Sequence, residues 1–387
     1  MLTSSYPTKK DPSSGPFIQH LARSLVKQHV DVSVLIYAND GIFKEYWDKT
    51  GIRVIEYTYS FFLPPVLHKH YGLIPTLKRS FLAKIEFPMY LVSTLYYVYK
   101  YAKNCDLIHA HWFLPSGLIT AVYKKLTKKP YIVTAWGAEF HLPKSFLVRK
   151  LLTYVYRNAN DAVTVSKYMK RVSFEYFKNS MMVVPNGIDV NGFRPSRYAH
   201  SSKIVIGAIR LLVPEKRIED LFHAAALLPP RLKKHILVHI IGDGPERKNL
   251  EQLAHKLRID AITTFFGYIS YNKIPQYINN MDIVVNPSIQ EGMATANLEA
   301  MAMEKPVIAA RGFGNDETVV YGKTGYLYSP KDVIDLKDKL ILLIHNATLR
   351  RTMGRRGRQI IVEQFSIDHI ACDYILLYKR LCRSITS

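Results

Sequence analysis

Residues 282–310 read DIVVNPSIQEGMATANLEAMAMEKPVIAA, and their succession of apolar and polar residues predicts a fold class. An apolar run of strand length, DIVVNPS, precedes a polar loop, a helix-length run rich in Ala, Leu and Met, and a second apolar run, KPVIAA. Near-continuous Val and Ile runs are typical of parallel strands that helices cover on both faces. Lys305 marks the end of the helix, because a residue before proline avoids helical geometry. The stretch therefore predicts one strand–helix–strand unit of a parallel sheet.

The same alternation extends along the chain in two series. Further strands are expected at residues 31–38, 106–112, 130–136, 161–166 and 181–186, and then at 203–209, 236–244 and 261–268. Helix-length segments between them include residues 16–28, 146–158, 218–228 and 246–257. Two series of this kind predict two doubly wound α/β domains. The polar segment 191–203, which contains Gly and Pro, is the expected join, so we place the domains at residues 1–196 and 203–365.

The chain is basic, and its positive charge is concentrated in the first half. It has 387 residues, of which 48% are hydrophobic, so it can bury large cores. The formal net charge is +22; residues 1–200 contain 27 Lys and Arg against 12 Asp and Glu, and the remainder contains 26 against 19. This excess favours an anionic partner for the first half. Nucleic acid, an anionic membrane and phosphorylated small molecules all satisfy the charge alone, as does a generally basic proteome.

Cysteine usage and the apolar runs bear on location. Cys105, Cys372 and Cys382 are few, odd in number and without metal-ligand spacing, which predicts a reducing compartment and no disulfide framework. The start, MLTSSYPTKKDP, lacks the basic and apolar segments of a signal peptide. The longest uncharged runs, residues 87–99 and 107–123, are too short or too interrupted to span a bilayer. We therefore expect a cytoplasmic protein, either soluble or peripheral on the inner face of the cell membrane.

Two glutamates, Glu291 and Glu299, flank the start of the predicted helix. With Thr295 as the expected N-cap, Glu291 lies in the loop at the carboxyl end of a strand and Glu299 about one turn inside the helix. Ligands of open parallel sheets bind at this end of the strands. Carboxylates accept hydrogen bonds from hydroxyls, and the first N–H groups of a helix bind phosphate. A nucleotide-sugar fits this arrangement, although Glu is also an ordinary residue of helix surfaces.

Seven segments in one order cover nearly the whole chain and together resemble the family 4 (group 1) glycosyltransferases. They are HAHWFLPSG (109–117), VTAWGAEF (133–140), VVPNGIDVNGFRP (183–195), LVPEK (212–216), IGDGPE (241–246), FFGYI (265–269) and the Glu-x7-Glu segment. The resemblance implies the α/β GT-B fold, with two doubly wound Rossmann-like domains facing across a cleft. The acceptor is then expected on residues 1–196 and the donor on residues 203–365. Residues 366–387 resemble the family's last helix, which crosses back onto the first domain.

The resemblance assigns donor contacts in the second domain. Glu299 is expected to bind the ribose hydroxyls, Glu291 to face the donor sugar, and Lys216 to contact the diphosphate. The family usually has an arginine where Leu211 stands; Arg210, one place earlier, either replaces it or points elsewhere. The expected catalytic residues are thus Glu291, Lys216 and Arg210. The other expected donor-binding residues are Gly292, Met293, Ala294, Thr295, Ala296 and Gly242.

The expected acceptor and cleft residues are Gly15, His109, His111, Trp136, Gly137 and Asn186. Trp136 stands where the family often has histidine, and it either stacks on a sugar or packs in the core. His109 and His111 share one face of a strand; lacking further ligands at suitable spacing, they are expected to be hydrogen-bonded side chains and not metal ligands. Gly15 either lets the backbone approach a ligand or forms an ordinary turn. Residues 312–317, GFGNDE, depart from the family's usual Gly-Gly-x-Pro-Glu.

These expectations converge on a retaining glycosyltransferase that moves a hexose from a nucleotide-diphosphate sugar to a glycan or lipid-linked acceptor, without a metal or another cofactor. Two rivals are another GT-B sugar-nucleotide enzyme, such as an epimerase, and a basic nucleic-acid-binding protein. The ordered motifs argue against the second, so no nucleic-acid partner is expected. A further expectation is that residues 57–103 bind an anionic membrane surface, the alternative being a core helix with a solvated basic face. The basic residues of that segment are Lys69, Lys78, Arg79, Lys84, Lys100 and Lys103.

Overall fold

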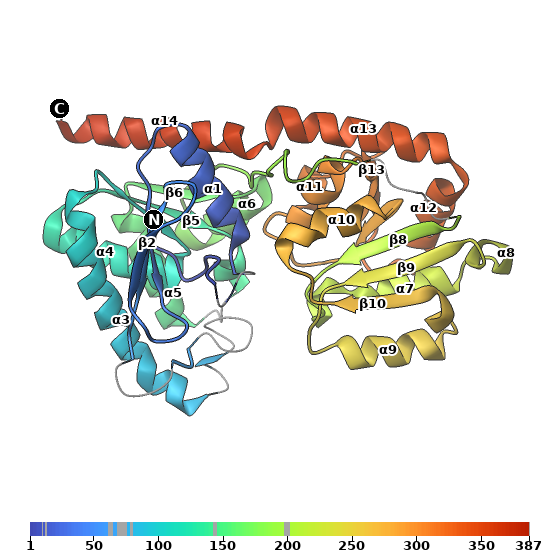
Figure 1. Ribbon diagram of the computed structural model, residues 1–387, viewed down its shortest axis with the longest axis horizontal. Coiled ribbons are helices and arrows are strands. Elements are labelled where there is room, and N and C mark those ends of the chain that lie inside the picture. The colour runs from blue at the N-terminus through green and yellow to red at the C-terminus, as the bar shows by residue number, and fades with distance from the viewer. Residues whose placement is uncertain are drawn as a thin grey trace. The chain divides into compact units, whose positions relative to one another are not determined.

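The computed structural model describes residues 1–9, 11, 14–60, 65–67, 76–77, 80–141, 145–196 and 202–386. The chain forms two compact units (Figure 1). Unit 1 comprises Met1–Pro185 together with Ile370–Ser387, and unit 2 comprises Asn186–His369. Each unit is built on a largely parallel sheet with helices packed on it, as the alternating apolar runs require.

The sheet of unit 1 is joined at its centre by the first residues of the chain. One part has the strand order β1 (Ser33–Tyr37), β3 (Arg53–Tyr57) and β2 (Lys44–Trp47), with β2 antiparallel to β3. The other part has the order β4 (Ile108–His111), β5 (Tyr131–Ala135), β6 (Asp161–Thr164) and β7 (Met182–Val183), all parallel. Leu2 forms parallel bridges to both Leu35 and Ala110, so residues 1–3 lie between β1 and β4.

Two helices of unit 1, α1 (Pro16–Lys27) and α5 (Phe146–Asn158), match the segments predicted at residues 16–28 and 146–158. The structure adds α3 (Phe81–Tyr101), α4 (Leu118–Thr127) and α6 (Lys167–Phe177). Ser145 and Ser166 cap α5 and α6, since their hydroxyls accept hydrogen bonds from the N–H groups of Val148 and Met169. The last helix, α14 (Ile367–Thr386), belongs to unit 1 from Ile370 onward.

Unit 2 is a six-stranded parallel sheet. Its strand order is β10 (Thr263–Gly267), β9 (Ile236–Ile241), β8 (Ile204–Ile209), β11 (Ile283–Asn286), β12 (Val307–Ala310) and β13 (Gly325–Tyr328). The helices that pack on it are α7 (Ile218–Ala226), α8 (Pro230–Lys233), α9 (Arg247–Lys256), α10 (Ile274–Asn279), α11 (Thr295–Ala302), α12 (Val333–His345) and α13 (Ala347–Gln364). The chain runs outward from β8 to β9 and β10, then returns to β11 on the other side. The carboxyl ends of β8 and β11 therefore form the topological switch point, where open α/β sheets bind ligands.

One local prediction is wrong and another is too long. Helix α11 begins at Thr295, but its N-cap position is Ala294, whose side chain cannot accept a hydrogen bond. The Thr295 hydroxyl accepts instead from Asn186 Nδ2, at 3.1 Å. The strand expected at residues 181–186 is limited to Met182–Val183. The three cysteines form no disulfide among the described residues.

Candidate active site

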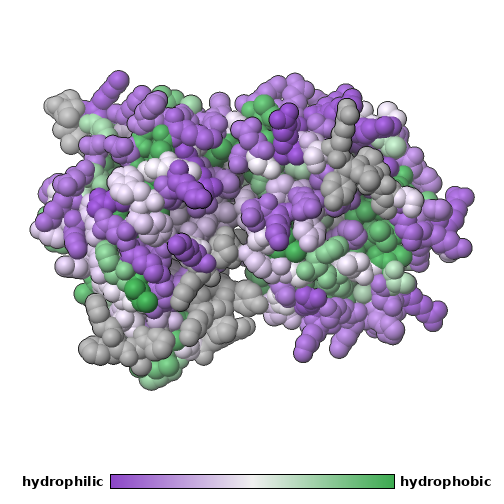
Figure 2. Space-filling view, in the orientation of Figure 1, coloured by the Kyte–Doolittle hydropathy of each residue, from purple (hydrophilic) through white to green (hydrophobic). Residues whose placement is uncertain are grey.

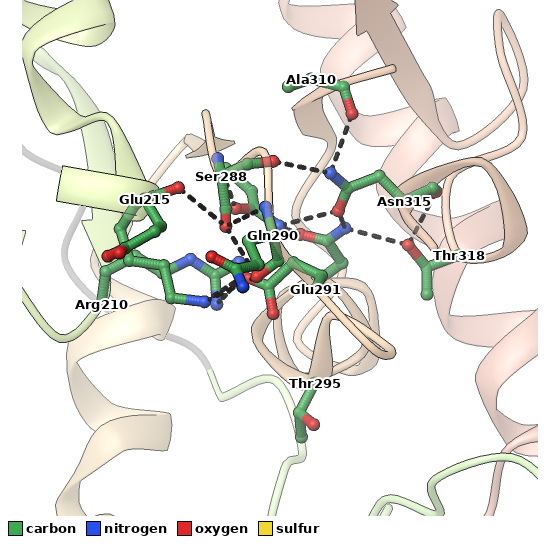
Figure 3. Close-up of polar contacts among 12 residues, drawn as sticks. Arg210, Glu215, Ser288, Gln290, Glu291, Thr295, Ala310, Asn315 and Thr318 are labelled. Atoms are coloured by element: carbon green, nitrogen blue, oxygen red, sulfur yellow. Dashed lines mark hydrogen bonds and ion pairs between the residues drawn. The ribbon is translucent and has the colours of Figure 1, made fainter. Parts of the chain in front are cut away.

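A carboxylate held between two cations lies at the switch point of unit 2 (Figure 3). Arg210 directly follows β8, Lys216 ends the 3-10 turn Pro214–Lys216, and Glu291 lies in the loop after β11. Lys216 Nζ donates to Glu291 Oε1 at 2.9 Å and to the Gln290 carbonyl at 3.1 Å. Arg210 Nη1 lies 3.6 Å from the same Glu291 oxygen. The structure thus brings the three predicted catalytic residues together.

Arg210, and not Leu211, supplies the cation at this position. The Leu211 side chain is exposed, whereas that of Arg210 is only 9% exposed and points at Glu291. Arg210 Nη2 is buried and has no hydrogen-bond partner in the part of the chain that the structure describes. A buried guanidinium N–H without a partner is unfavourable unless a ligand satisfies it. This donor can therefore bind an anionic oxygen.

The two cations keep Glu291 ionised. Burial alone would raise the pKa of Glu291, but the charges of Arg210 and Lys216 outweigh that effect and lower it. One carboxylate between two cations leaves the group with a net positive charge. The first N–H groups of α11 add partial positive charge nearby, since they have no partner within the helix. The site therefore favours a ligand with more than one negative charge.

Glu299 lies in a contrasting environment one turn inside α11. It is buried and forms a hydrogen bond with the hydroxyl of Tyr271, a residue of the 3-10 turn Tyr271–Lys273. Burial raises the pKa of Glu299 to about 7, and the Tyr271 hydrogen bond and the charge of Arg210 offset it only in part. Two carboxyls of one loop–helix segment thus differ in protonation: Glu291 is ionised, whereas Glu299 titrates near neutral pH. Tyr271 was not predicted from the sequence, because it lies on a separate turn with no periodic signal.

The predicted donor loop packs tightly against Asn186. Met293, Ala294 and Ala296 are buried, and the Asn186 backbone N–H lies 3.3 Å from Met293 Sδ. Asn186 Nδ2 donates to Thr295, while Asn186 Oδ1 is buried without a hydrogen-bond partner among the described residues. Asn186 therefore belongs to unit 2 and fixes the start of α11; the sequence assigned it to the acceptor side.

A buried amide network fixes the loop that carries Glu291. Asn286 Nδ2 donates to Asn297 Oδ1 at 2.8 Å and to Asn315 Oδ1 at 3.0 Å. Asn297 Nδ2 donates to Asn315 Oδ1 at 3.0 Å and to Thr318 Oγ1 at 2.9 Å. Asn315 Nδ2 donates in turn to the carbonyls of Ser288 and Ala310 (Figure 3). The network ties the ends of β11 and β12 to α11, and Asn315 lies within the GFGNDE segment that departs from the family pattern.

Gly242 packs closely against the backbone of Arg210. It has a φ of 125°, and a Cβ there would lie 1.8 Å from the Arg210 carbonyl oxygen. Its N–H donates to the Gly267 carbonyl at 2.8 Å. Only glycine permits this approach between the exits of β8 and β9. The structure therefore relates Gly242 to the position of the Arg210 backbone.

In unit 1, two predicted histidines of β4 lie side by side with their rings tilted relative to each other. The ring centroids of His109 and His111 are 4.1 Å apart, and both side chains are buried. His109 Nδ1 lies 2.6 Å from Tyr378 Oη of α14, and its Nε2 lies 2.8 Å from Thr134 Oγ1. Burial lowers the pKa of His109 to about 3, so its ring is neutral. His109 is therefore fully hydrogen-bonded within unit 1, as the sequence led us to expect.

His111 differs from its neighbour. Both of its ring nitrogens are buried without a hydrogen-bond partner among the described residues, and burial lowers its pKa well below the usual value. Its ring stacks on that of Trp136 with a centroid separation of 5.8 Å. The indole N–H groups of Trp112 and Trp136 are also buried and unpartnered in the described part of the chain. These four nitrogens can hydrogen-bond a polar ligand, since buried polar groups are otherwise almost always satisfied.

A buried carboxylate that the sequence did not single out organises these loops. Glu139 Oε2 accepts from the Gly137 N–H at 2.9 Å, and its Oε1 accepts from Phe113 N–H at 3.2 Å and Trp136 N–H at 3.4 Å. Gly137 is thus held by Glu139, on the loop after β5.

Gly15, at the N-cap of α1, has a φ of 60°, and a Cβ there would lie 2.4 Å from the Ser5 carbonyl oxygen. The backbone that approaches Gly15 in the structure is that of Ser5.

Comparison with known proteins identifies the family. Residues 193–360 match the family model described as glycosyl transferases group 1, and residues 15–191 match that of glycosyltransferase family 4. An uncharacterized glycosyltransferase of Methanocaldococcus jannaschii is 31% identical over 297 residues, covering 75% of this chain and 81% of its own. The chain belongs to the family 4, group 1 glycosyltransferases. Like other members, it is an enzyme that transfers sugar to an acceptor.

Two further comparisons extend this assignment. The GDP-mannose-dependent alpha-(1-6)-phosphatidylinositol monomannoside mannosyltransferase of Mycobacterium tuberculosis is 28% identical over 233 residues, covering 55% of this chain and 60% of its own. The solved structure of Anabaena HepE in complex with UDP has a TM-score of 0.75 at 19% identity, covering 98% of each chain. At that identity the likeness shows the fold alone, which is GT-B. No group of three or more His, Cys, Asp or Glu placed to hold a metal ion occurs among residues that the structure describes.

Proposed function

We propose that this glycosyltransferase moves a hexose from a nucleotide-diphosphate sugar to a glycan or lipid-linked acceptor, with retention of the anomeric configuration. The observation that carries the proposal is the Arg210–Glu291–Lys216 group at the switch point of unit 2, beside the first turn of α11. A net positive group next to a helix N-terminus suits a diphosphate. The structural neighbour Anabaena HepE was solved in complex with UDP, and the mycobacterial relative is named for GDP-mannose; both support a nucleotide donor.

The donor would span the two carboxylates. The diphosphate lies at Arg210, Lys216 and the amides of residues 293–296; the ribose hydroxyls donate to Glu299; and Glu291 accepts from a hydroxyl of the sugar. As the bond between sugar and phosphate breaks, negative charge grows on the leaving diphosphate. Cations already fixed by Glu291 and by the amide network stabilise that charge without having to reorganise. The acceptor hydroxyl attacks from the face that the phosphate leaves and transfers its proton to a phosphate oxygen. This route needs no enzyme nucleophile and no metal.

The acceptor would bind unit 1 at His111 and Trp136, whose buried nitrogens can pair with hydroxyl groups. The indole ring offers an apolar face to a sugar ring. A lipid-linked acceptor would place the enzyme in the cytoplasm at the inner face of the cell membrane. The mycobacterial relative, named for a phosphatidylinositol monomannoside acceptor, supports this class.

A donor screen tests the proposal. The protein is incubated with UDP- and GDP-linked hexoses, with and without glycan and lipid acceptors, and mass spectrometry follows nucleotide release and product. We expect acceptor-dependent release from one donor, and NMR of the product should show the anomeric configuration of the donor. Epimerised donor without net transfer would favour an epimerase and contradict the proposal. Inverted product would refute retention alone.

Two variants then separate the roles of the carboxylates. Glu291→Gln should lower kcat more than affinity for the nucleotide diphosphate, because Glu291 is proposed to act on the sugar. Glu299→Ala should weaken nucleotide binding by about 1.5–3 kcal/mol, the usual worth of a hydrogen bond to a charged group. Isothermal titration with UDP or GDP and steady-state kinetics are made on the same preparations. Equal losses in both quantities for Glu291→Gln would contradict its assignment to the sugar.

A further inference from the structure

Helix α3 of unit 1 presents an apolar stripe to solvent along its whole length. We call it the α3 stripe; its members and their exposed fractions are Phe81 75%, Leu82 48%, Ile85 50%, Met89 37%, Val92 71%, Tyr96 60% and Tyr99 50%. From Ile85 onward the spacing alternates between four and three residues, which keeps these side chains on one face. At 1.5 Å per residue the stripe is about 27 Å long. In Figure 2, green apolar surface lies over α3 at the lower left, beside purple hydrophilic residues.

The opposite face of α3 is anchored in the core of unit 1. Ala83, Tyr90, Thr94 and Val98 are buried there. Thr94 Oγ1 lies 2.6 Å from Tyr57 Oη of β3, and the Ser93 hydroxyl donates to the Thr58 carbonyl at 2.6 Å. The helix is therefore apolar on both sides, and its core-facing side is already occupied. Apolar patches of this size on a monomer are often functional.

The exposed charged residues of α3 itself are positive, although Glu45 of β2 accepts a hydrogen bond from Tyr101 at the end of the helix. Glu86 is the only acidic residue of α3, and it is buried and accepts a hydrogen bond from the Val66 N–H at 3.0 Å. Lys84 and Lys100 are exposed on the helix, and Lys103 follows it. Lys103 Nζ lies 4.6 Å from the Tyr99 ring centroid, so this cation sits at the edge of the stripe. The outer face of α3 thus combines apolar side chains with cations and carries no exposed carboxylate of its own.

We propose that α3 docks on a bilayer that contains anionic lipids. The stripe enters the headgroup layer, and Lys84, Lys100 and Lys103 pair with lipid phosphates. Docking is peripheral, since none of the helices in the described ranges is long and apolar enough to cross a membrane. Lys69, Lys78 and Arg79, expected from the sequence to take part, lie outside the described residues.

A second copy of the chain fits the stripe less well than a bilayer does. A helix is about 10 Å wide with its side chains, so a stripe about 27 Å long offers on the order of 300 Å². A stable dimer buries about 800 Å² on each partner. Positive charges flanking the stripe would also meet positive charges across a twofold axis, whereas they complement anionic lipid.

Vesicle sedimentation of the full chain tests the proposal. Phosphatidylcholine vesicles with none to about 40% phosphatidylglycerol are compared at about 0.05 M and about 0.5 M salt, where screening is short-ranged. The variant Ile85→Glu/Val92→Glu is matched by Ile334→Glu/Leu342→Glu on α12 of unit 2, which are 52% and 48% exposed and make the same charge change. Lys84→Gln/Lys100→Gln is matched by Lys248→Gln/Lys256→Gln, exposed residues of α9.

Wild-type binding should rise with phosphatidylglycerol and fall with salt. Ile85→Glu/Val92→Glu should lower the partition coefficient at least about 30-fold, because two apolar side chains lose their burial. The α12 variant should bind as the wild type does. Lys84→Gln/Lys100→Gln should weaken the dependence on phosphatidylglycerol, and the α9 variant should leave it unchanged. Nucleotide affinity should be equal in all of them, which separates docking from the donor site in unit 2. Tryptophan fluorescence, which reports on unit 1, should also be unchanged and confirms that unit 1 is folded.

Three outcomes would overturn membrane docking. The first is a wild-type protein that ignores vesicles with about 40% phosphatidylglycerol at low salt. The second is binding that survives in Ile85→Glu/Val92→Glu and in the milder Val92→Ser/Tyr96→Ser. The third is a wild-type dimer in sedimentation velocity that Ile85→Glu/Val92→Glu converts to monomer without any vesicle binding, which would make α3 an interface between copies.

Discussion

Replacing Glu299 with glutamine should remove part of the pH dependence of the stability of unit 2. The pKa of Glu299 rises from 4.5 to about 7 in the folded protein because its carboxyl is buried. The stability that the protonated carboxyl provides is therefore fully present below pH 4.5 and is lost as the pH rises through 7. Each pKa unit corresponds to about 1.4 kcal/mol, so ionising Glu299 costs the native state about 3 kcal/mol by pH 8. Glutamine keeps the shape but does not ionise.

Urea unfolding at several pH values measures this effect. The free energy of unfolding of the wild type, minus that of Glu299→Gln, should fall by about 3 kcal/mol between pH 4.5 and pH 8. All three tryptophans, Trp47, Trp112 and Trp136, lie in unit 1. Tryptophan fluorescence therefore reports on unfolding of unit 1. The change in far-UV circular dichroism that has no matching change in fluorescence reports on unit 2, so the two unfolding steps can be told apart.

Glu291→Gln is the matched control, because the pKa of Glu291 is lowered and the sign is opposite. Its ionised carboxylate stabilises the fold above its ordinary pKa, and that contribution is lost in acid. The wild type should therefore gain stability over Glu291→Gln as the pH rises through the acid range. A stability difference for Glu299→Gln that does not change with pH, or that follows the sign of Glu291→Gln, would refute the environment assigned to Glu299.

Three further outcomes follow from other contacts. Arg210→Ala should weaken binding of UDP or GDP about 10–100-fold in isothermal titration, because a charge-assisted contact is lost, whereas Leu211→Ala should leave it unchanged. Asn297→Ala should lower the free energy of unfolding by about 2–3 kcal/mol in urea, since its partners in the amide network are left buried and unsatisfied. His111→Phe should lower the transfer rate with little change in nucleotide affinity, whereas His109→Phe should mainly lower the thermal midpoint, because His109 bridges Thr134 and Tyr378.

Local patterns in the sequence predicted the strand–helix–strand units well, because helical and extended runs differ in period and each buried run is continuous. The spacing of Glu291 and Glu299 was informative for the same reason: both lie on one loop–helix segment, whose geometry is short-range. The Asn286–Asn297–Asn315 network was not predictable, since its members come from three segments and asparagine is common in loops. Thr295 was mistaken for the N-cap because its hydroxyl is a good acceptor, yet Asn186, more than a hundred positions away, uses that hydroxyl.

Helix α3 shows a different limit of sequence reasoning. The segment is rich in aromatic and aliphatic residues at every turn, so no polar face marks the side that meets solvent. The pattern is therefore compatible with either orientation, and only packing against β3 decides which stripe is buried. The sequence predicted membrane binding by residues 57–103, with a solvated basic face as the alternative; the outer face of α3 is mainly apolar, with lysines at its margins.

Arg210 links the two carboxylates of the site. Its charge lowers the pKa of both Glu291 and Glu299, while one of its N–H donors has no partner among the described residues. A diphosphate that binds this N–H group would partly neutralise the charge of Arg210. Arg210 would then lower the pKa of Glu299 by less. Glu299 would then be harder to ionise unless hydroxyl donors compensate, and in the proposed donor complex the ribose hydroxyls would supply them. A free diphosphate would weaken the effect of Arg210 on Glu299 without supplying hydroxyl donors, whereas a nucleotide would do both. Under the proposed assignment, a diphosphate that carries a ribose should therefore bind better than a diphosphate alone.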